Sequence, residues 1–130
     1  MKLLLDTHVW LWCAIEPHRL RDAVRAAIFD PDNSVHVSAA SIWEVALKHE
    51  IGRLPLPVPL PDFVATQTGL GIAEVLDITA AHAVAAGALP RHHRDPFDRM
   101  LVAQAHVEGL TLVTADEALR AYGVPLLWAT

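Results

Sequence analysis

The chain has 130 residues, 53% of them hydrophobic, and this length supports one compact core rather than two. Its formal net charge of -5 at pH 7 excludes a surface that attracts nucleic acid as a whole, so any such contact must be local. The single cysteine, Cys13, excludes an internal disulfide framework, and no stretch approaches the ~20 apolar residues of a membrane span. We therefore expect one soluble, cytoplasmic domain over residues 1–130.

The first half of the chain alternates short apolar runs with segments of helical periodicity. Continuous apolar runs predict buried strands, and apolar residues at helical spacing predict helices. In chain order, the expected elements are a strand at 2–5, helices at 7–15 and 20–30, a strand at 35–37 and a helix at 41–51. Thr7 is the expected N-cap of the first helix, and Gly52 is expected to end the last.

The second half begins with a proline-rich segment, 54–62, that cannot form a central strand or a helix interior and is expected to be an extended connector. The expected elements after it are a helix at 62–70, a strand at 73–78, helices at 79–89 and 95–109, a strand at 110–114, a short helix at 115–123 and an edge strand at 124–128. The helix at 95–109 has the clearest signals, because Asp95 suits an N-cap, Pro96 the first turn and Gly109 the end.

This alternation predicts an α/β fold, in which a parallel sheet of four to five strands is flanked by helices. Ligands of such sheets collect at the carboxyl ends of the strands. Four acids are expected at that edge, namely Asp6, Glu44, Asp98 and Asp116. Asp6 directly follows a fully apolar strand, which favours a crevice over a simple turn.

Glu44 and Asp116 also have purely structural interpretations. Glu44 is expected in the first turn of its helix, where it could complete a capping box with Ser41 or pair with Lys48 one turn on. Asp116 lies in "TADE", another capping pattern, where the helix dipole favours its charge. Both interpretations stay open at the level of the residues.

Asp98 is more informative than its neighbour Asp95, which has a structural role as N-cap. Asp98 shares a helix face with Leu101, Val102 and Ala105. A carboxylate on an inward apolar stripe needs a cation or several hydrogen-bond donors to stay charged. Asp98 is therefore a candidate metal ligand.

Carboxylates that converge in one cleft repel one another and raise each other's pKa unless a cation neutralises them. Ligand sets made only of oxygen favour Mg²⁺, with Mn²⁺ as a substitute. The chemistry that such a site supports is phosphodiester hydrolysis, in which metal-activated water attacks and the metal stabilises charge on the phosphoryl oxygens.

Four segments in this order resemble the VapC toxins, which are PIN-domain ribonucleases of bacterial type II toxin-antitoxin modules. The segments are "LLLDTHVWLW", "SAASIWEVALKHEIGRL", "HHRDPFDRMLVAQA" and "LTLVTADEALRAYGV". The resemblance runs nearly end to end. It implies a parallel sheet flanked by helices, Mg²⁺-dependent endoribonuclease activity and inhibition by a cognate VapB-like antitoxin.

The resemblance also assigns roles to individual residues. By position, the family's four catalytic acids correspond to Asp6, Glu44, Asp98 and Asp116, with Asp6 and Asp98 as the primary metal ligands. Asp95 belongs to the "RDPFDR" form of the third motif and either contacts the site or only caps the helix. The hydroxyl donors expected to orient the carboxylates are Thr7, Ser41 and Thr114.

The one dense basic patch precedes and overlaps the start of the helix at 95–109, and consists of Arg91, His92, His93, Arg94 and Arg99. On an acidic chain, this patch predicts the contact with the RNA backbone, and a solvated loop is the alternative. A zinc or iron site on the two histidines and Asp95 is disfavoured, because no separated nitrogen or sulfur ligand completes it.

Three further interpretations concern partners and other functions. The apolar run 10–15 and the proline-rich connector are candidate surfaces for a homodimer or for the antitoxin, and the tryptophans are expected in the core or at a partner surface rather than under RNA bases. Asp6 does not indicate an aspartyl-nucleophile phosphatase, because those enzymes need a second aspartate where His8 stands. A PIN-like module that only binds RNA or protein is the alternative to an enzyme, although its acid set should be broken.

Overall fold

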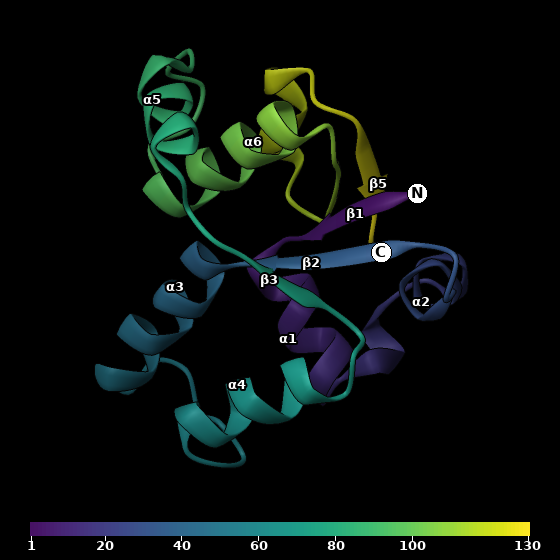
Figure 1. Cartoon of the computed structure of the whole chain (residues 1–130). Helices are drawn as coiled ribbons and strands as arrows, with labels where there is room; N and C mark the ends of the chain where they lie inside the picture. The colour runs from purple at the N-terminus through teal and green to yellow at the C-terminus, as the bar shows by residue number, and fades with distance from the viewer.

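All five strands of the protein run in the same direction, and helices cover both faces of the sheet they form, as the computed structural model of residues 1–130 shows (Figure 1). The elements are β1 (Lys2–Leu5), α1 (Thr7–Ile15), η1 (Pro17–Arg19), α2 (Asp22–Phe29), β2 (Ser34–Ser38), α3 (Ala39–Glu50), α4 (Leu60–Gly69), β3 (Glu74–Leu76), α5 (Ala80–Ala88), α6 (Pro96–Glu108), β4 (Thr111–Thr114), η2 (Glu117–Tyr122) and β5 (Leu126–Trp128). The predicted fold class, a parallel sheet flanked by helices, is confirmed.

The strand order is β3-β2-β1-β4-β5, which places β1 at the centre of the sheet. β1 pairs with β2 through Leu3 opposite Val35, and with β4 through Leu5 opposite Val113. A central strand covered on both faces must be apolar throughout, and this explains the run of three leucines that ends at Asp6. Asp6 therefore leaves the sheet at the carboxyl edge of its middle strand.

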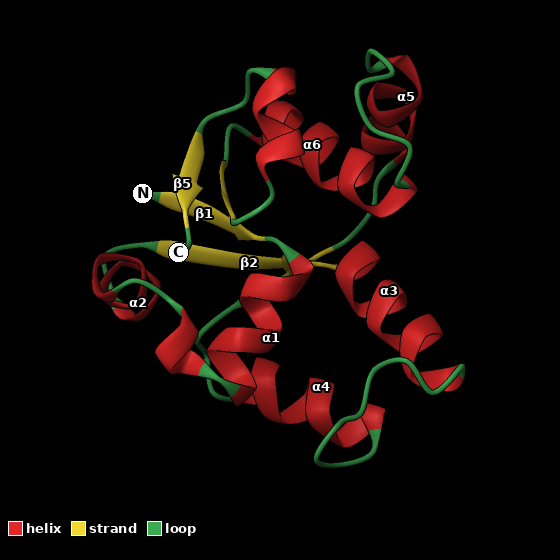
Figure 2. Cartoon of the chain, turned by 180° about the vertical axis from the view of Figure 1, so that it is seen from behind, coloured by secondary structure: helices red, strands yellow, loops and turns green.

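Side chains of β1 alternate between two apolar cores, one on each face of the sheet. Leu3 and Leu5 pack with residues of α1, α2 and α4, whereas Leu4 packs with Leu101 of α6 and with η2. Figure 2 shows these two groups of helices on opposite sides of the strands. At ~25 cal/mol per Å² of buried apolar surface, these two cores dominate the stability that holds the sheet edge in place.

The apolar run 10–15 belongs largely to the first of these cores. Trp10 is 4% exposed and packs against Phe63 of α4, with 5.5 Å between ring centroids. Leu11 is also buried, and only the end of the run, at Ile15, is exposed. The predicted docking role of this run is therefore restricted to its last residues. No helix is both long enough and apolar enough to cross a membrane.

Two helix starts differ from the predictions. The carboxylate of Asp6 accepts the N–H of Thr7, so Asp6 rather than Thr7 is the N-cap of α1. Likewise, α3 begins at Ala39 with Ser38 as its N-cap, two residues before the predicted start at Ser41. Glu44 consequently lies in the second turn of α3 instead of the first. Ser41 is not the N-cap, so the alternative in which Glu44 completes a capping box with Ser41 does not apply.

The proline-rich connector is shorter than predicted. α4 begins at Leu60 and contains Pro61 in its first turn, where the missing N–H of proline costs no helical hydrogen bond. The segment 115–123, predicted as a short helix, forms the 3₁₀ helix η2. Thr79, Asp95 and Gly109 cap α5 and α6 as predicted.

Candidate active site

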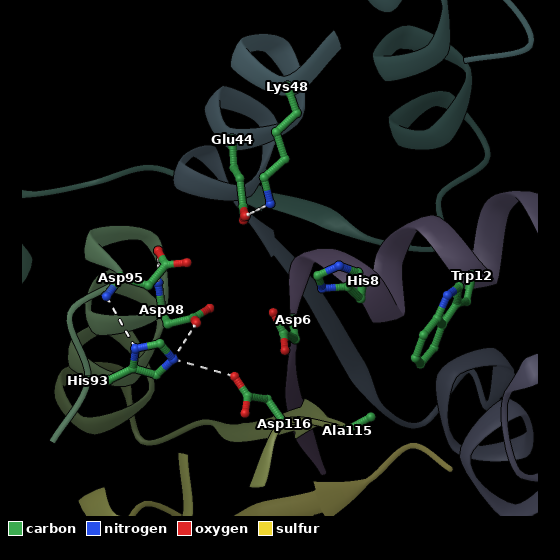
Figure 3. Close-up of a pocket in the computed structure, with 10 residues that line it drawn as sticks. All are labelled: Asp6, His8, Trp12, Glu44, Lys48, His93, Asp95, Asp98, Ala115 and Asp116. Atoms are coloured by element: carbon green, nitrogen blue, oxygen red, sulfur yellow. Dashed lines mark hydrogen bonds and ion pairs between the residues drawn. The ribbon is translucent and has the colours of Figure 1, made fainter. Parts of the chain in front are cut away.

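A cleft of about 410 Å³ opens at the carboxyl edge of the sheet, beside the ends of β1 and β4 (Figure 3). Its lining residues are Asp6, His8, Trp12, Glu44, Lys48, His93, Asp95, Asp98, Ala115 and Asp116. The structure thus brings together the four predicted acids and Asp95, which come from four separate segments of the chain. Two of the ten lining residues are apolar, so the cleft suits a charged ligand.

Asp6 is 4% exposed and is held by two hydrogen bonds. Its Oδ1 accepts the backbone N–H of Thr7 at 2.7 Å, and its Oδ2 accepts the hydroxyl of Thr114 at 2.7 Å. Burial raises the pKa of Asp6, while the hydrogen bond from Thr114 and the charge of nearby His8 oppose this rise. Thr114 therefore orients Asp6 across the β1–β4 pair.

Glu44 is 3% exposed, and both of its carboxylate oxygens have partners. Oε1 accepts the hydroxyl of Thr7 at 2.7 Å, and Oε2 accepts the ammonium of Lys48 at 2.5 Å. Because the one hydroxyl proton of Thr7 goes to Glu44, Ser41, whose Oγ lies 2.9 Å away, acts as the donor to Thr7. Thr7 and Ser41 thus form a chain that fixes Glu44 between α1 and α3.

Asp98 is the third residue of α6, and its side chain is 13% exposed. Burial, followed by the negative charges of Asp6, Asp95, Glu44 and Asp116, raises the pKa of Asp98 from 3.8 to about 8. Asp95 has a separate local role, since its Oδ1 accepts the N–H of Phe97 at 2.8 Å as N-cap of α6. Asp98 is therefore the acid whose negative charge is least compensated by the protein itself.

His93 lies between two of the acids. Its Nε2 is 3.0 Å from Asp98 Oδ2 and 3.5 Å from Asp116 Oδ2. Its Nδ1 accepts the backbone N–H of Asp95 at 3.2 Å, so this nitrogen carries no proton and Nε2 is the N–H donor toward the carboxylates. In this arrangement the Nε2 N–H of His93 faces Asp98 and Asp116, and His93 is not a free metal ligand.

The acids of the cleft fit a hard divalent cation. Asp6, Asp98 and Asp116 have no lysine or arginine partner, and potential ligand atoms of Asp98, Asp116 and His93 lie within 4.8 Å of one another. Carboxylate oxygens favour Mg²⁺ or Mn²⁺, and a divalent ion would remove the repulsion that raises the pKa of Asp98. The carboxylates of Asp6, Asp98 and Asp116 therefore form the donor set of a magnesium or manganese site.

The predicted basic patch divides into residues with different surroundings. A second cavity of about 490 Å³ adjoins the acidic cleft at His93 and is lined by Gly87, Arg91, His93, Arg94 and Arg99. Arg99 is engaged within the protein, because its guanidinium donates to the backbone carbonyl of Ala86 in the last turn of α5 and to those of Leu89 and Pro90 just beyond it.

The remaining members of the patch are His92, Arg91 and Arg94. His92 packs edge-on against Tyr122, with 5.2 Å between ring centroids, and does not line either cavity. Arg91 and Arg94 are exposed and make no ion pair within the chain. They are therefore the two arginines of the patch with guanidinium groups free to meet a ligand.

Four lining residues were not predicted as site residues, namely His8, Trp12, Lys48 and Ala115. His8 and Trp12 lie on α1, one turn apart, and their rings are 6.2 Å from each other. Lys48 was expected only as a surface partner of Glu44. A helical spacing of four from Glu44 is the sequence signal that could have placed Lys48 on the wall of the cleft.

Comparison with known proteins gives the family. The profile of the PIN domain matches residues 3–125. The chain is 36% identical to ribonuclease VapC22 of Mycobacterium tuberculosis over 124 residues, which are 95% of this chain and 93% of that protein. The chain therefore belongs to the PIN-domain family, in its VapC branch.

Solved structures with low sequence identity show the same fold. A crystal structure of VapBC2 from Rickettsia felis, bound to a DNA fragment from the promoter, superposes with a TM-score of 0.74 at 17% identity, over 100% of both chains. The DNA-bound VapBC of Salmonella typhimurium gives a TM-score of 0.72 at 19% identity, over 98% of both chains.

Proposed function

We propose that this protein is an endoribonuclease, dependent on Mg²⁺ or Mn²⁺, that acts as the toxin of a type II toxin-antitoxin module and forms a single PIN domain over residues 1–130. The observation that carries the proposal is the cleft, in which Asp6, Glu44, Asp98 and Asp116 converge and Asp98 lacks a compensating cation. A relative named as a ribonuclease matches nearly the whole chain, and this supports the choice of RNA as substrate.

Asp6, Asp98 and Asp116 are the residues that would hold the ion. Thr114 and the N–H of Thr7 keep the two oxygens of Asp6 in fixed directions, so that this ligand need not reorganise when the ion binds. When bound, the ion would supply Lewis-acid chemistry, lowering the pKa of water and neutralising phosphoryl oxygens. His93 keeps its N–H directed at Asp98 and Asp116 and thereby separates the two carboxylates in the free enzyme.

Arg91 and Arg94 are the proposed contacts to the RNA backbone. They line a cavity without apolar residues, and this cavity meets the acidic cleft at His93. An RNA strand that crosses the basic cavity and the acidic cleft would place one phosphate in each. This local basic surface accounts for RNA binding by a chain whose net charge is -5. Arg99 supports the same cavity from within, through its three carbonyl contacts. His92 packs on Tyr122 and lies outside the cavity, so we do not propose it as an RNA contact.

Cleavage by the purified protein tests the catalytic part of the proposal. Protein freed from any partner should cut structured RNA in Mg²⁺ or Mn²⁺ and stop in EDTA, and Asp6→Asn or Asp98→Asn should each abolish cutting. A non-catalytic binding module would instead bind RNA equally well with either replacement and show no cleavage with any metal. Cutting by both variants at the wild-type rate would refute the assigned site.

The toxin role needs a separate experiment in cells. The VapBC structures from Rickettsia felis and Salmonella typhimurium contain the same fold, and on this basis we propose a VapB-like antitoxin partner. We also propose a homodimeric toxin, as expected from the apolar surface residues of the sequence. Induced expression of the chain alone should arrest bacterial growth, and co-expression of a small antitoxin from the adjacent reading frame should restore it. Normal growth with active, soluble protein in the cells would leave a nuclease without a toxin role.

A further inference from the structure

The acidic cleft contains one lysine or arginine, Lys48, and its ammonium lies on the wall opposite the proposed metal ligands. Figure 3 shows the side chains of Glu44 and Lys48 descending together from α3, while Asp98 and Asp116 lie across the cleft beside His93. The side chain of Lys48 is 43% exposed, so its ammonium can meet a molecule that enters the cleft. Within the cleft, the one lysine charge therefore stands on the side of α3, across from Asp98 and Asp116.

Glu44 differs from the other acids because its charge is already compensated. Lys48 binds one of its oxygens at 2.5 Å and Thr7 binds the other at 2.7 Å. A divalent ion at Glu44 would have to displace the ammonium or bind beside it against charge repulsion. Asp6, Asp98 and Asp116 present no such obstacle, since none of them pairs with a lysine or an arginine.

The surroundings of Lys48 keep it protonated. Its pKa is raised by the hydrogen bond to Glu44 and by the charges of Glu44, Asp95 and Asp98, while burial acts in the opposite direction. A protonated ammonium is a compact point charge suited to a phosphate oxygen. Unlike a bound metal ion, it cannot leave the site, because it is part of the chain. The anionic backbone of RNA needs such charges in a cleft lined by five carboxylates.

Building on the proposed nuclease function, we propose that the site uses one divalent ion, on the wall formed by Asp6, Asp98 and Asp116, and that Lys48 takes the position of a second cation. Its ammonium contacts a non-bridging oxygen of the phosphate that is cleaved. Glu44 is then the positioning residue for Lys48 rather than a metal ligand, and Thr7 fixes Glu44 in turn.

The atoms of the hydrolysis balance without any proton from Lys48. A water oxygen forms a bond to phosphorus, and the bond from phosphorus to one ribose oxygen breaks. One water proton ends on the departing ribose oxygen, and the other leaves with the phosphate product or solvent. Lys48 stays protonated throughout and stabilises the charge on the non-bridging oxygen, a type of contact that is worth about 10² to 10³ in rate at preorganised sites.

Three lysine variants test this assignment in the full-length protein. Lys48→Met removes the charge but keeps the length of the side chain, Lys48→Arg keeps the charge, and Lys2→Met is the matched control. Lys2 is the one other lysine of the chain, and it lies exposed at the start of β1, away from the carboxyl edge of the sheet. Mn²⁺ binding without RNA is measured by calorimetry, and cleavage of one RNA is measured in parallel.

Wild-type protein should bind one Mn²⁺ per chain. Lys48→Met should bind Mn²⁺ about threefold more tightly than the wild type, or tighter still, because a repelling charge is gone. Its rate of RNA cleavage should fall about 100-fold. Lys48→Arg should cleave faster than Lys48→Met, and Lys2→Met should match the wild type in both measurements.

Binding of two Mn²⁺ ions per wild-type chain would overturn the proposal. RNA cleavage by Lys48→Met at the wild-type rate would overturn it as well. Loss of Mn²⁺ binding in Lys48→Met would also overturn it, because Lys48 would then serve to build the metal site. Wild-type protein that neither binds Mn²⁺ nor cuts RNA would refute the nuclease function itself, which is a separate result.

Discussion

Replacing Asp98 with asparagine should make the metal-free protein more stable while it removes a proposed metal ligand. In the folded chain, burial and then the charges of Asp6 and the other acids raise the pKa of Asp98 from 3.8 to about 8. Asparagine has nearly the same shape, and its Oδ1 can still face the Nε2 of His93, which lies 3.0 Å from Asp98 Oδ2. The replacement therefore removes the charge without leaving a cavity or an unpaired donor.

The sign of the pH dependence follows from the direction of this shift. The folded pKa of Asp98 exceeds the unfolded value, so the stability that its proton contributes is fully present below 3.8 and is lost as the pH rises toward about 8. For an isolated group the loss is about 1.4 kcal/mol per pH unit, which sets an upper bound of about 4 kcal/mol at pH 7.

The side chain of Asp98 is still 13% exposed, so water screens part of this cost, and the expected stabilisation by Asp98→Asn is about 2 kcal/mol at neutral pH. For a chain of this size, that corresponds to a rise in Tm of about 6 °C. The gain should be smaller near pH 5 and larger near pH 8, because the loss of stability from Asp98 accumulates with each pH unit between the unfolded pKa of 3.8 and the folded pKa of about 8.

Urea and thermal unfolding in EDTA, at about pH 5.5 and about pH 8.5, measure this difference. The control is Asp62→Asn, which removes an exposed carboxylate from the first turn of α4 and should not stabilise the protein. Equal stability of Asp98→Asn and wild type at the higher pH would show that the protein compensates the charge of Asp98 in a way that our reasoning omits.

Four further replacements address the site, its supporting residues and the end of α6. Thr114→Val removes the hydroxyl that binds Asp6, and Mn²⁺ affinity by calorimetry should fall about 10- to 100-fold, with an unchanged circular dichroism spectrum. Arg94→Ala should weaken RNA binding and lower the slope of log affinity against log salt by about one, as measured by fluorescence anisotropy. Arg99→Ala should mainly lower Tm, because three backbone carbonyls lose their donor. Gly109→Ala should cost about 1 kcal/mol in chemical unfolding, because Gly109 ends α6 at φ 66° and the cost is backbone strain rather than collision. The reasoning is contradicted if Mn²⁺ affinity, the salt slope, Tm or the free energy of unfolding, respectively, stays at the wild-type value.

Elements whose local signals agree were predicted well from the sequence. After Lys2, β1 consists of three leucines up to Asp6. α6 has an N-cap at Asp95, a proline in its first turn at Pro96 and a glycine at its end, Gly109. The position of the acids also followed from the sequence, because the carboxyl ends of parallel strands meet at one edge. The structure brings those acids into one cleft.

Helix starts with two competing caps could not be resolved in this way. Thr7 and Ser41 are good capping residues by type, yet Asp6 and Ser38 cap the helices instead. The hydroxyl of Thr7 is used for Glu44, which lies 37 positions further along the chain. Only the packing of α1 against α3 decides between these roles, and a local pattern contains no information on that packing.

Side-chain direction limits the prediction of the site in the same way. His92 and His93 are adjacent and chemically equal in the sequence, but His92 packs on Tyr122 whereas His93 lies between Asp98 and Asp116. The loop before α6 sets these directions, and its conformation depends on tertiary contacts.

The position of β1 in the middle of the sheet has a consequence for the order in which the site assembles during folding. Asp6 follows β1 directly, but its hydrogen-bond partner Thr114 lies 108 positions away, at the end of the neighbouring strand β4. The fixed direction of the Asp6 carboxylate therefore depends on a long-range strand pairing, and such pairings form more slowly than local contacts. A segment that contains only Asp6 and Glu44 cannot complete the cleft.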